Sequence, residues 1–198
     1  IFNENDFENI YNSFGYEEAI SRDKSSLSYL AAPSDDLWLL MLDTSIYDFN
    51  ELMGSPTTNG EITSETFEWI KQCSQLGKDN QAQIVTVMHH NLFNHSEVLY
   101  SGFTLDNNEE ALKVFQECDF NLVLSGHIHI QDIKSSEDEG SKQIYDIATS
   151  ALSVYPVKYG VLNFNKKQGF DYSTSSVDVE NWAKESGNSD ENIINFKE

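Results

Sequence analysis

Positive charge is scarce in this chain. Twelve Lys and Arg residues stand against 33 Asp and Glu residues, which gives a formal net charge of −21 at pH 7. A surface this negative repels phosphate backbones and anionic lipids, so we expect no binding to nucleic-acid backbones or membrane surfaces. An anionic substrate would need a local source of positive charge, and a bound metal ion supplies one.

Long apolar runs are also missing. No run in the sequence approaches the roughly 20 residues of a transmembrane span, and no signal peptide is recognisable. These absences favour a soluble protein, either cytoplasmic or exported. The first residue is Ile1 rather than Met, which indicates a processed chain or a fragment.

Cysteines are few, and the two that are present, Cys73 and Cys118, lie on the apolar stripes of two expected helices. A free cysteine in such a position behaves as a small buried hydrophobe. We favour this interpretation over a disulfide or a pair of metal ligands.

What the chain does contain is an alternation of strand and helix patterns that is typical of an α/β protein. Apolar runs at 37–42, 83–88 and 120–124 predict strands, and amphipathic patterns between them predict helices. This order indicates a parallel core. The run at 37–42 is apolar throughout, which predicts a strand buried on both faces, and the run at 27–32 is its expected hairpin partner.

Capping signals predict where the two helices begin and end. Thr63 is the expected N-cap of the first helix and Gly77 its expected C′ glycine, while Asn107 opens the second helix. Three further strand patterns follow, at 143–149, 159–165 and 170–177. Short polar loops join them and predict an antiparallel meander, so the sheet system is expected to be mixed.

All five histidines fall in two short segments, 89–95 and 127–129, each shortly after a predicted strand. His127 and His129 are spaced i, i+2, and on an extended backbone such side chains point to the same side. Open α/β sheets bind ligands at the C-terminal ends of their strands. Because neutral imidazole binds zinc, manganese and iron well, we favour metal binding over the alternative of hydrogen-bonded or surface histidines.

Four stretches of the chain carry a family resemblance. Gly126-His127-Ile128-His129 resembles the Gly-His-x-His motif of the calcineurin-like metallophosphoesterases, and Val87-Met88-His89-His90-Asn91 resembles that family's earlier single-histidine motif. Asp43-Thr44-Ser45 and Gln131-Asp132-Ile133 are similar to its bacterial cyclic-nucleotide-phosphodiesterase-like branch. The resemblance covers about residues 5 to 177. It assigns residues 1–177 to the C-terminal part of a metallophosphoesterase domain, and residues 178–198 to a polar tail or the start of a C-terminal helical region.

The resemblance implies a mixed-sheet α/β/β/α sandwich with two divalent metal ions, Mn, Fe or Zn, at the ends of its strands. It assigns His89 and His127 to one metal and His129 to the other.

It implies further roles near the metals. His90, Asn91 and His95 become candidates for substrate binding or for supporting the metal ligands, with surface-loop histidines as the alternative for His90 and His95. Asp43 either orients a ligand or only ends its strand.

Three motifs of the family are absent from the sequence: Asp-x-His, Gly-Asp-x-x-Asp and Gly-Asn-His. The N-terminal half of the sandwich is therefore expected to be missing, and with it the catalytic His, which we place upstream of Ile1. The intact protein would be a hydrolase that cleaves a phosphodiester or phosphomonoester of a small molecule, a cyclic nucleotide among the candidates, with a metal-activated hydroxide. This chain alone is expected to be inactive.

Two other hypotheses stay open. In the first, the chain is a noncatalytic domain that binds no metal, or binds one metal weakly through His89, His127 and His129. Otherwise it is an unrelated α/β binding module whose histidines cluster by accident, which requires them to lie far apart in space. Loss of half a sandwich would leave an open sheet edge or apolar face, so we also expect the chain to self-associate.

Overall fold

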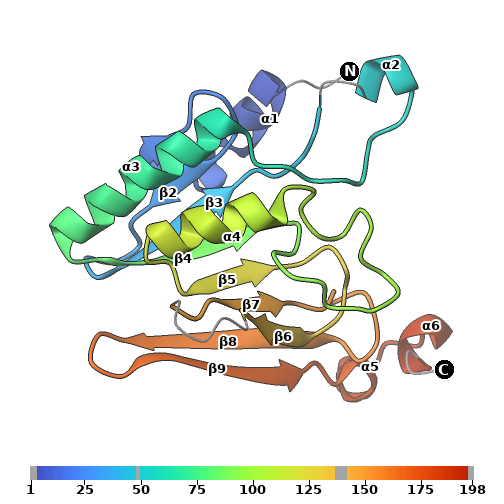
Figure 1. The fold of residues 1–198 in the computed structure, drawn as a ribbon. Coiled ribbons are helices and arrows are strands. Elements are labelled where there is room, and N and C mark those ends of the chain that lie inside the picture. The colour runs from blue at the N-terminus through green and yellow to red at the C-terminus, as the bar shows by residue number, and fades with distance from the viewer. Residues whose placement is uncertain (1–3, 48–49, 137–141, 196–198) are drawn as a thin grey trace.

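A seven-stranded mixed sheet forms the centre of the fold (Figure 1). The computed structural model describes residues 4–47, 50–136 and 142–195. The strands are β1 (Ala19–Arg22), β2 (Tyr29–Ala31), β3 (Leu37–Leu42), β4 (Gln83–Met88), β5 (Leu122–Ser125), β6 (Asp132–Ser135) and β7 (Tyr145–Ala148). Their spatial order is β1-β2-β3-β4-β5-β7-β6. Strands β3, β4, β5 and β7 are parallel to one another, and β1, β2 and β6 add antiparallel edges.

Helices α3 (Ser64–Asn80) and α4 (Asn108–Glu117) cover one face of this sheet (Figure 1). Strands β3, β4 and β5 are added in one direction, so right-handed crossovers place both connecting helices on the same side. The main core lies between these helices and the sheet, and Phe115, Leu40 and Ile70 are buried within it. The predicted order of strands and helices over this region is confirmed.

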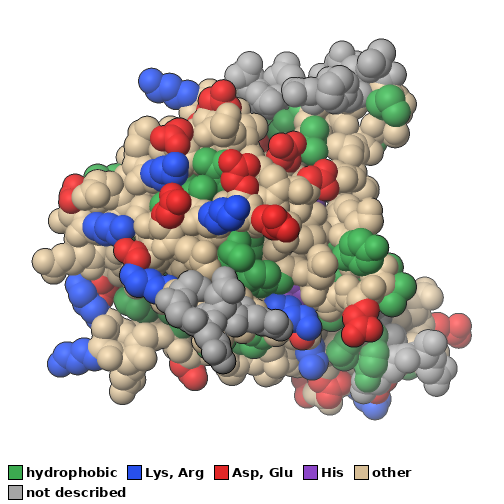
Figure 2. Space-filling view, viewed as in Figure 1, with side chains coloured by type: hydrophobic (Ala, Val, Ile, Leu, Met, Phe, Trp, Pro, Cys, Tyr) green, Lys and Arg blue, Asp and Glu red, His purple; other side chains and the backbone are tan. Residues whose placement is uncertain are grey.

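The remaining helices are short. They are α1 (Glu4–Tyr11), the 3-10 helices Asn12–Phe14 and Tyr16–Glu18, α2 (Asn50–Met53), α5 (Val179–Ser186) and α6 (Glu191–Ile194). Within the described ranges no helix is long and apolar enough to cross a membrane. Figure 2 shows acidic and basic side chains interspersed over α3 and α4, where Lys71 and Glu68 form an ion pair at 2.8 Å.

An antiparallel hairpin of β8 (Lys158–Asn165) and β9 (Gly169–Ser176) covers part of the opposite face. Its Leu162, Phe170 and Tyr172 pack against the cluster formed by the sheet residues Val85, Leu122 and Ile147. The successive layers are therefore helices, sheet and hairpin, which confirms a mixed α/β sandwich.

The predicted meander is wrong at its first strand. Residues 145–148 form β7 inside the central sheet, parallel to β5 and antiparallel to β6, whereas only the later two segments pair as a hairpin. The sequence pattern predicts the strand correctly. It contains no information about the pairing partner β5, which lies about 20 residues earlier in the chain.

Strand β3 is buried less completely than its apolar sequence predicts. Trp38, Leu40 and Leu42 are buried against the helices, but the alternate residues Leu37, Leu39 and Met41 are only partly buried. The prediction of burial on both faces is therefore wrong, because the hairpin covers the second face only in part. Self-association through such a face stays a prediction.

The end of α3 also differs from the sequence prediction. The helix continues past Gly77 to Asn80, and its C-cap is Gln81 in the left-handed conformation with φ of 56°. A Cβ at Gly77 would lie 2.8 Å from Ile84 Cδ1. The glycine therefore allows α3 to approach β4 closely, and it does not end the helix.

Both cysteines are free and buried, as predicted. Burial raises the pKa of the Cys73 thiol to about 12. The thiol therefore stays protonated near neutral pH, and a protonated thiol is a poor metal ligand.

Candidate functional site

Two histidines meet at the C-terminal edge of the parallel strands. His89 directly follows β4, and His127 lies two residues beyond β5. His89 Nε2 is 2.8 Å from His127 Nδ1, and their ring centroids are 4.4 Å apart. The ring of His90 lies 4.8 Å from that of His127. The hypothesis of an accidental cluster required distant histidines, and these three do not meet that requirement.

The proton positions in this pair follow from a backbone carbonyl. His127 Nε2 lies 2.9 Å from the carbonyl oxygen of Gly102, which can only accept a hydrogen bond, so Nε2 carries the proton. The lone pair of neutral His127 is then on Nδ1, and His89 Nε2–H donates to it. A metal-binding histidine commonly donates its other ring N–H to a carbonyl in this way.

The neutral form of His89 is favoured by its surroundings. Burial lowers its pKa, and the neighbouring charges of His127 and His129 lower it further. His129 is exposed, and its role as a metal ligand stays a prediction. Neutral imidazole is the form that binds metal ions.

The backbone around His127 is not extended, which overturns one expectation. Strand β5 ends at Ser125, and both His127 (φ 60°) and His129 (φ 58°) are in the left-handed region. Ile128 N–H donates to the Gly126 carbonyl at 2.6 Å, which closes a three-residue turn around His127. The rule that i and i+2 side chains share a strand face therefore does not apply. Left-handed non-glycine residues store strain and cluster at functional sites.

His90 is buried rather than exposed, so the alternative of a surface-loop histidine is wrong for it. Its side chain fills a polar niche: Nδ1 lies 2.6 Å from Thr44 Oγ1, and Nε2 lies 3.0 Å from the carbonyl oxygen of Thr58. Burial lowers the pKa of His90 to about 4. A substrate contact would have to break one of these two hydrogen bonds, so substrate binding by His90 stays a prediction.

Asn91 is fully buried. Its Nδ2 donates to Ser125 Oγ at 2.8 Å and to the Gly126 carbonyl at 3.1 Å. Within the described residues these contacts link the loop after β4 to the turn after β5. A direct contact between Asn91 and a substrate is untested and stays a prediction.

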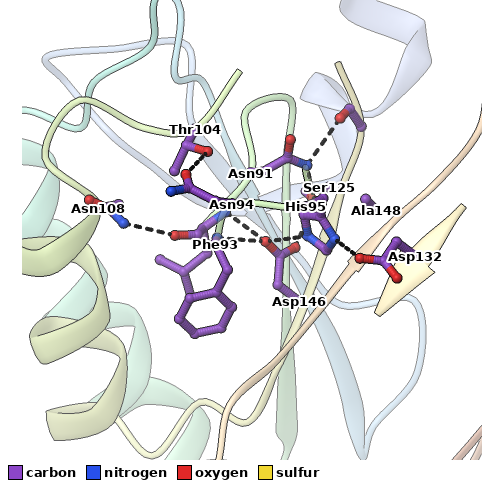
Figure 3. Close-up of polar contacts among 12 residues, drawn as sticks. Asn91, Phe93, Asn94, His95, Thr104, Asn108, Ser125, Asp132, Asp146 and Ala148 are labelled. Carbon is purple, nitrogen blue, oxygen red and sulfur yellow. Dashed lines mark hydrogen bonds and ion pairs between the residues drawn. The ribbon is translucent and has the colours of Figure 1, made fainter. Parts of the chain in front are cut away.

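The most connected polar residue near the pair is Asp146 on β7, whose side chain is completely buried (Figure 3). It accepts hydrogen bonds from Ser125 Oγ at 2.6 Å, from the backbone N–H groups of Leu92 and Phe93 at 2.7 and 3.0 Å, and from His95 Nε2 at 3.1 Å. We did not identify Asp146 from the sequence. A single carboxylate inside the apolar segment 144–148 was the signal that could have revealed it.

His95 lies between two carboxylates. Its Nδ1 is 2.9 Å from Asp132 Oδ2 and its Nε2 is 3.1 Å from Asp146 Oδ2 (Figure 3). Burial opposes protonation of the ring, but the hydrogen bonds and charges of Asp146 and Asp132 outweigh it and raise the pKa of His95. The surface-loop alternative is wrong here as well. A contact with phosphate stays a prediction, because both ring nitrogens already have partners.

Asp43 lies at the end of β3, and its carboxylate accepts a hydrogen bond from the hydroxyl of Tyr47 at 3.0 Å. Asp43 and Tyr47 line a cavity of about 400 Å³ together with His89. This placement leaves both interpretations of Asp43 open, because the carboxylate ends the strand and also faces the space beside His89.

The fit of a metal ion to this site is partial. Two nitrogens that bind one tetrahedral ion at about 2.0–2.1 Å lie about 3.3 Å apart, so the 2.8 Å His89–His127 pair would open by about half an ångström. Among the residues that the structure describes, no group of three or more His, Cys, Asp or Glu side chains is arranged to hold a metal ion. The described residues therefore offer two ligands and do not complete a dinuclear centre.

Comparison with known proteins adds little to this geometry. No family model matches the chain, and no curated protein matches it. Among solved structures, the chain is similar to a dimetal phosphatase from Danio rerio, with 12% sequence identity and a TM-score of 0.48. The match covers 76% of this chain and 54% of the other, so it spans about half of that protein's length. A likeness of this size establishes neither a common family nor a common activity.

Proposed function

We propose that this chain provides part of the metal centre of a phosphoesterase. The observation that carries the proposal is the convergence of His89 and His127 at the C-terminal edge of the sheet, 2.8 Å apart, within the two motifs that resemble the metallophosphoesterases. Divalent ions in such a centre neutralise the charge of the transferred phosphoryl group and supply the nucleophile.

The chain's own residues then have defined tasks. His127 offers Nδ1 as a ligand while the Gly102 carbonyl holds its Nε2 proton. His89 would offer Nε2 once its proton has moved to Nδ1, and exposed His129 would be a ligand of the second ion. The carboxylates and other groups that complete two metal sites come from outside the described residues. The substrate is a small phosphate ester held in the space beside His89. The proposed reaction includes hydrolysis of phosphodiesters, and cyclic nucleotides are among the candidate substrates.

A second candidate function is a noncatalytic domain with one weak metal site. The observation that favours it is that the described residues contain no group of three ligands. Structural zinc sites use four protein ligands and catalytic sites three, so two or three histidines alone predict weak binding of one ion.

Isothermal calorimetry of the metal-free chain with Zn²⁺ and Mn²⁺ tests both candidates. We expect one ion per chain, with binding lost in His127→Gln and in His89→Gln. Glu68→Gln, which removes an exposed ion-pair partner on α3, is the control and should bind as the original chain does. Binding that is unaffected by replacing both histidines would refute the proposed site, and tight binding of two ions would refute the weak single site.

A further inference from the structure

We propose that Asp146 is the positioning residue of the histidine pair, because it fastens the loop that carries His89 and the turn that carries His127 to one carboxylate. Only the metal-binding consequence of this inference rests on the proposed function. The geometry of the pair itself is a property of the metal-free chain.

The two oxygens of Asp146 hold different segments. Oδ2 accepts from the backbone N–H groups of Leu92 and Phe93, which lie three and four residues after His89. Oδ1 accepts from Ser125 Oγ at 2.6 Å, two residues before His127. A single buried carboxylate therefore contacts both histidine-bearing segments, and Figure 3 shows Asp146 together with Phe93 and Ser125.

A second set of contacts follows the same course. The Gly126 N–H donates to the His89 carbonyl at 3.0 Å. Asn91 Nδ2 donates to Ser125 Oγ, whose own proton goes to Asp146. Hydrogen bonds arranged in such a chain polarise and strengthen one another. Ser125 is thus oriented by the loop on one side and by the carboxylate on the other.

The four partners of Asp146 explain why this position requires a carboxylate. Ser125, two backbone amides and His95 all donate, and an ionised carboxylate accepts at both oxygens. An Asn side chain would turn an NH₂ group toward donors on one side. If the remaining oxygen serves the amides and His95, the Ser125 proton loses its acceptor, although the size of the side chain is unchanged.

The charge of this buried carboxylate is balanced locally. His95 donates to Asp146 through Nε2 and to Asp132 through Nδ1. Each ring nitrogen of His95 therefore has a carboxylate partner, and a buried carboxylate is tolerated when it is paired and hydrogen-bonded in this way. His95 supports Asp146, and Asp146 in turn supports the histidine pair.

The test compares Asp146→Asn with a matched control, Asp23→Asn. Asp23 is also buried and accepts hydrogen bonds from Ser25, Ser26 and Thr66, and none of these partners lies in either histidine segment. Both variants therefore remove one charge from a buried carboxylate with several donors. A general loss of stability should affect them alike, whereas a positioning effect should appear only in Asp146→Asn.

The first measurement is the imidazole ¹⁵N spectrum of the metal-free chain near neutral pH. In the original chain and in Asp23→Asn, His127 should show the Nε2–H tautomer that the Gly102 contact imposes. In Asp146→Asn we expect averaged tautomers for His89 and His127. Unchanged tautomers in a folded Asp146→Asn chain would overturn the proposal.

The second measurement is Zn²⁺ affinity. Loss of a group that orients metal ligands typically costs about 10- to 100-fold in affinity, and we expect at least about a 10-fold loss for Asp146→Asn with little change for Asp23→Asn. If even the original chain binds no Zn²⁺, the proposed function fails, while the tautomer spectrum still decides the role of Asp146.

A milder variant guards against misfolding of Asp146→Asn. Ser125→Ala removes the hydrogen bond to Asp146 and the one from Asn91 Nδ2, and it leaves the other three donors to Asp146 in place. It should disturb the tautomer of His127 more than that of His89, and Ser125→Thr, which keeps the hydroxyl, should restore it. Equal spectra for Ser125→Ala and the original chain would contradict the coupling through Ser125.

Discussion

Acidification should destabilise this protein through His90, which is 3% exposed. Both ring nitrogens have partners that suit the neutral ring, because the Thr44 hydroxyl can donate to Nδ1 while Nε2–H donates to the Thr58 carbonyl. Burial lowers the pKa of His90 to about 4, whereas an unfolded histidine titrates near about 6.5. The contribution of neutral His90 to stability is therefore fully present above the pKa of the unfolded state, and it is lost as the pH falls toward the pKa of the folded state.

The magnitude follows from these two pKa values. With about 4 for the folded state and about 6.5 for the unfolded state, the loss is about 2 kcal/mol at a pH of about 5 and about 3 kcal/mol at a pH of about 4. The measurement is practical down to a pH of about 5. Closer to the sequence isoelectric point of about 4.3, the chain loses the net charge that keeps it soluble.

The assay is urea unfolding, followed by circular dichroism in the presence of a chelator, for the original chain and His90→Gln. Glutamine keeps a donor and an acceptor but does not titrate. The difference in free energy of unfolding between the two proteins should shrink by about 2 kcal/mol between about pH 7.5 and about pH 5. A difference that stays constant over this range would refute a buried neutral His90.

Three further predictions follow from the same structure. Because the pKa of His95 is raised, its contribution to stability is present below the unfolded value of about 6.5 and is lost as the pH rises through the folded pKa; the advantage of the original chain over His95→Gln in thermal unfolding should therefore fall at alkaline pH. Gln81→Gly should raise the free energy of unfolding by about 0.5–1 kcal/mol, because Gln81 is the left-handed C-cap of α3, and a decrease in urea unfolding would contradict that conformation. Phe115→Ala should cost about 3–5 kcal/mol, because Phe115 is fully buried; a loss below about 1 kcal/mol would show that the core is packed differently.

Some features of this protein follow from local sequence patterns. The apolar runs over β3, β4 and β5 and the stripes of α3 and α4 predicted their elements, because side-chain periodicity is set by the backbone geometry of each element. The N-cap at Thr63 is confirmed for the same reason: its side chain accepts from the Thr66 N–H within one turn. The pairing of β8 with β9 was also foreseeable, because a short loop joins them.

Other features depended on partners far away in the chain. The position of β7 between β5 and β6 is fixed by parallel pairing, which has no short-range signal. Gly77 reads as a helix end in the sequence, but it faces Ile84 in the fold. The half-covered face of β3 depends on where the hairpin lies, and a strand's own residues do not determine that.

The histidine pair shows both kinds of determination. The sequence by itself placed His89 and His127 at the ends of neighbouring strands, because strand ends follow from local hydrophobic pattern. Only the tertiary structure decided how the two rings meet: the left-handed turn at His127 replaced the expected extended path, and the Gly102 carbonyl fixed the proton. Asp146 lies 19 residues beyond His127 in the sequence, and the fold brings it beneath both segments because β5 and β7 pair side by side.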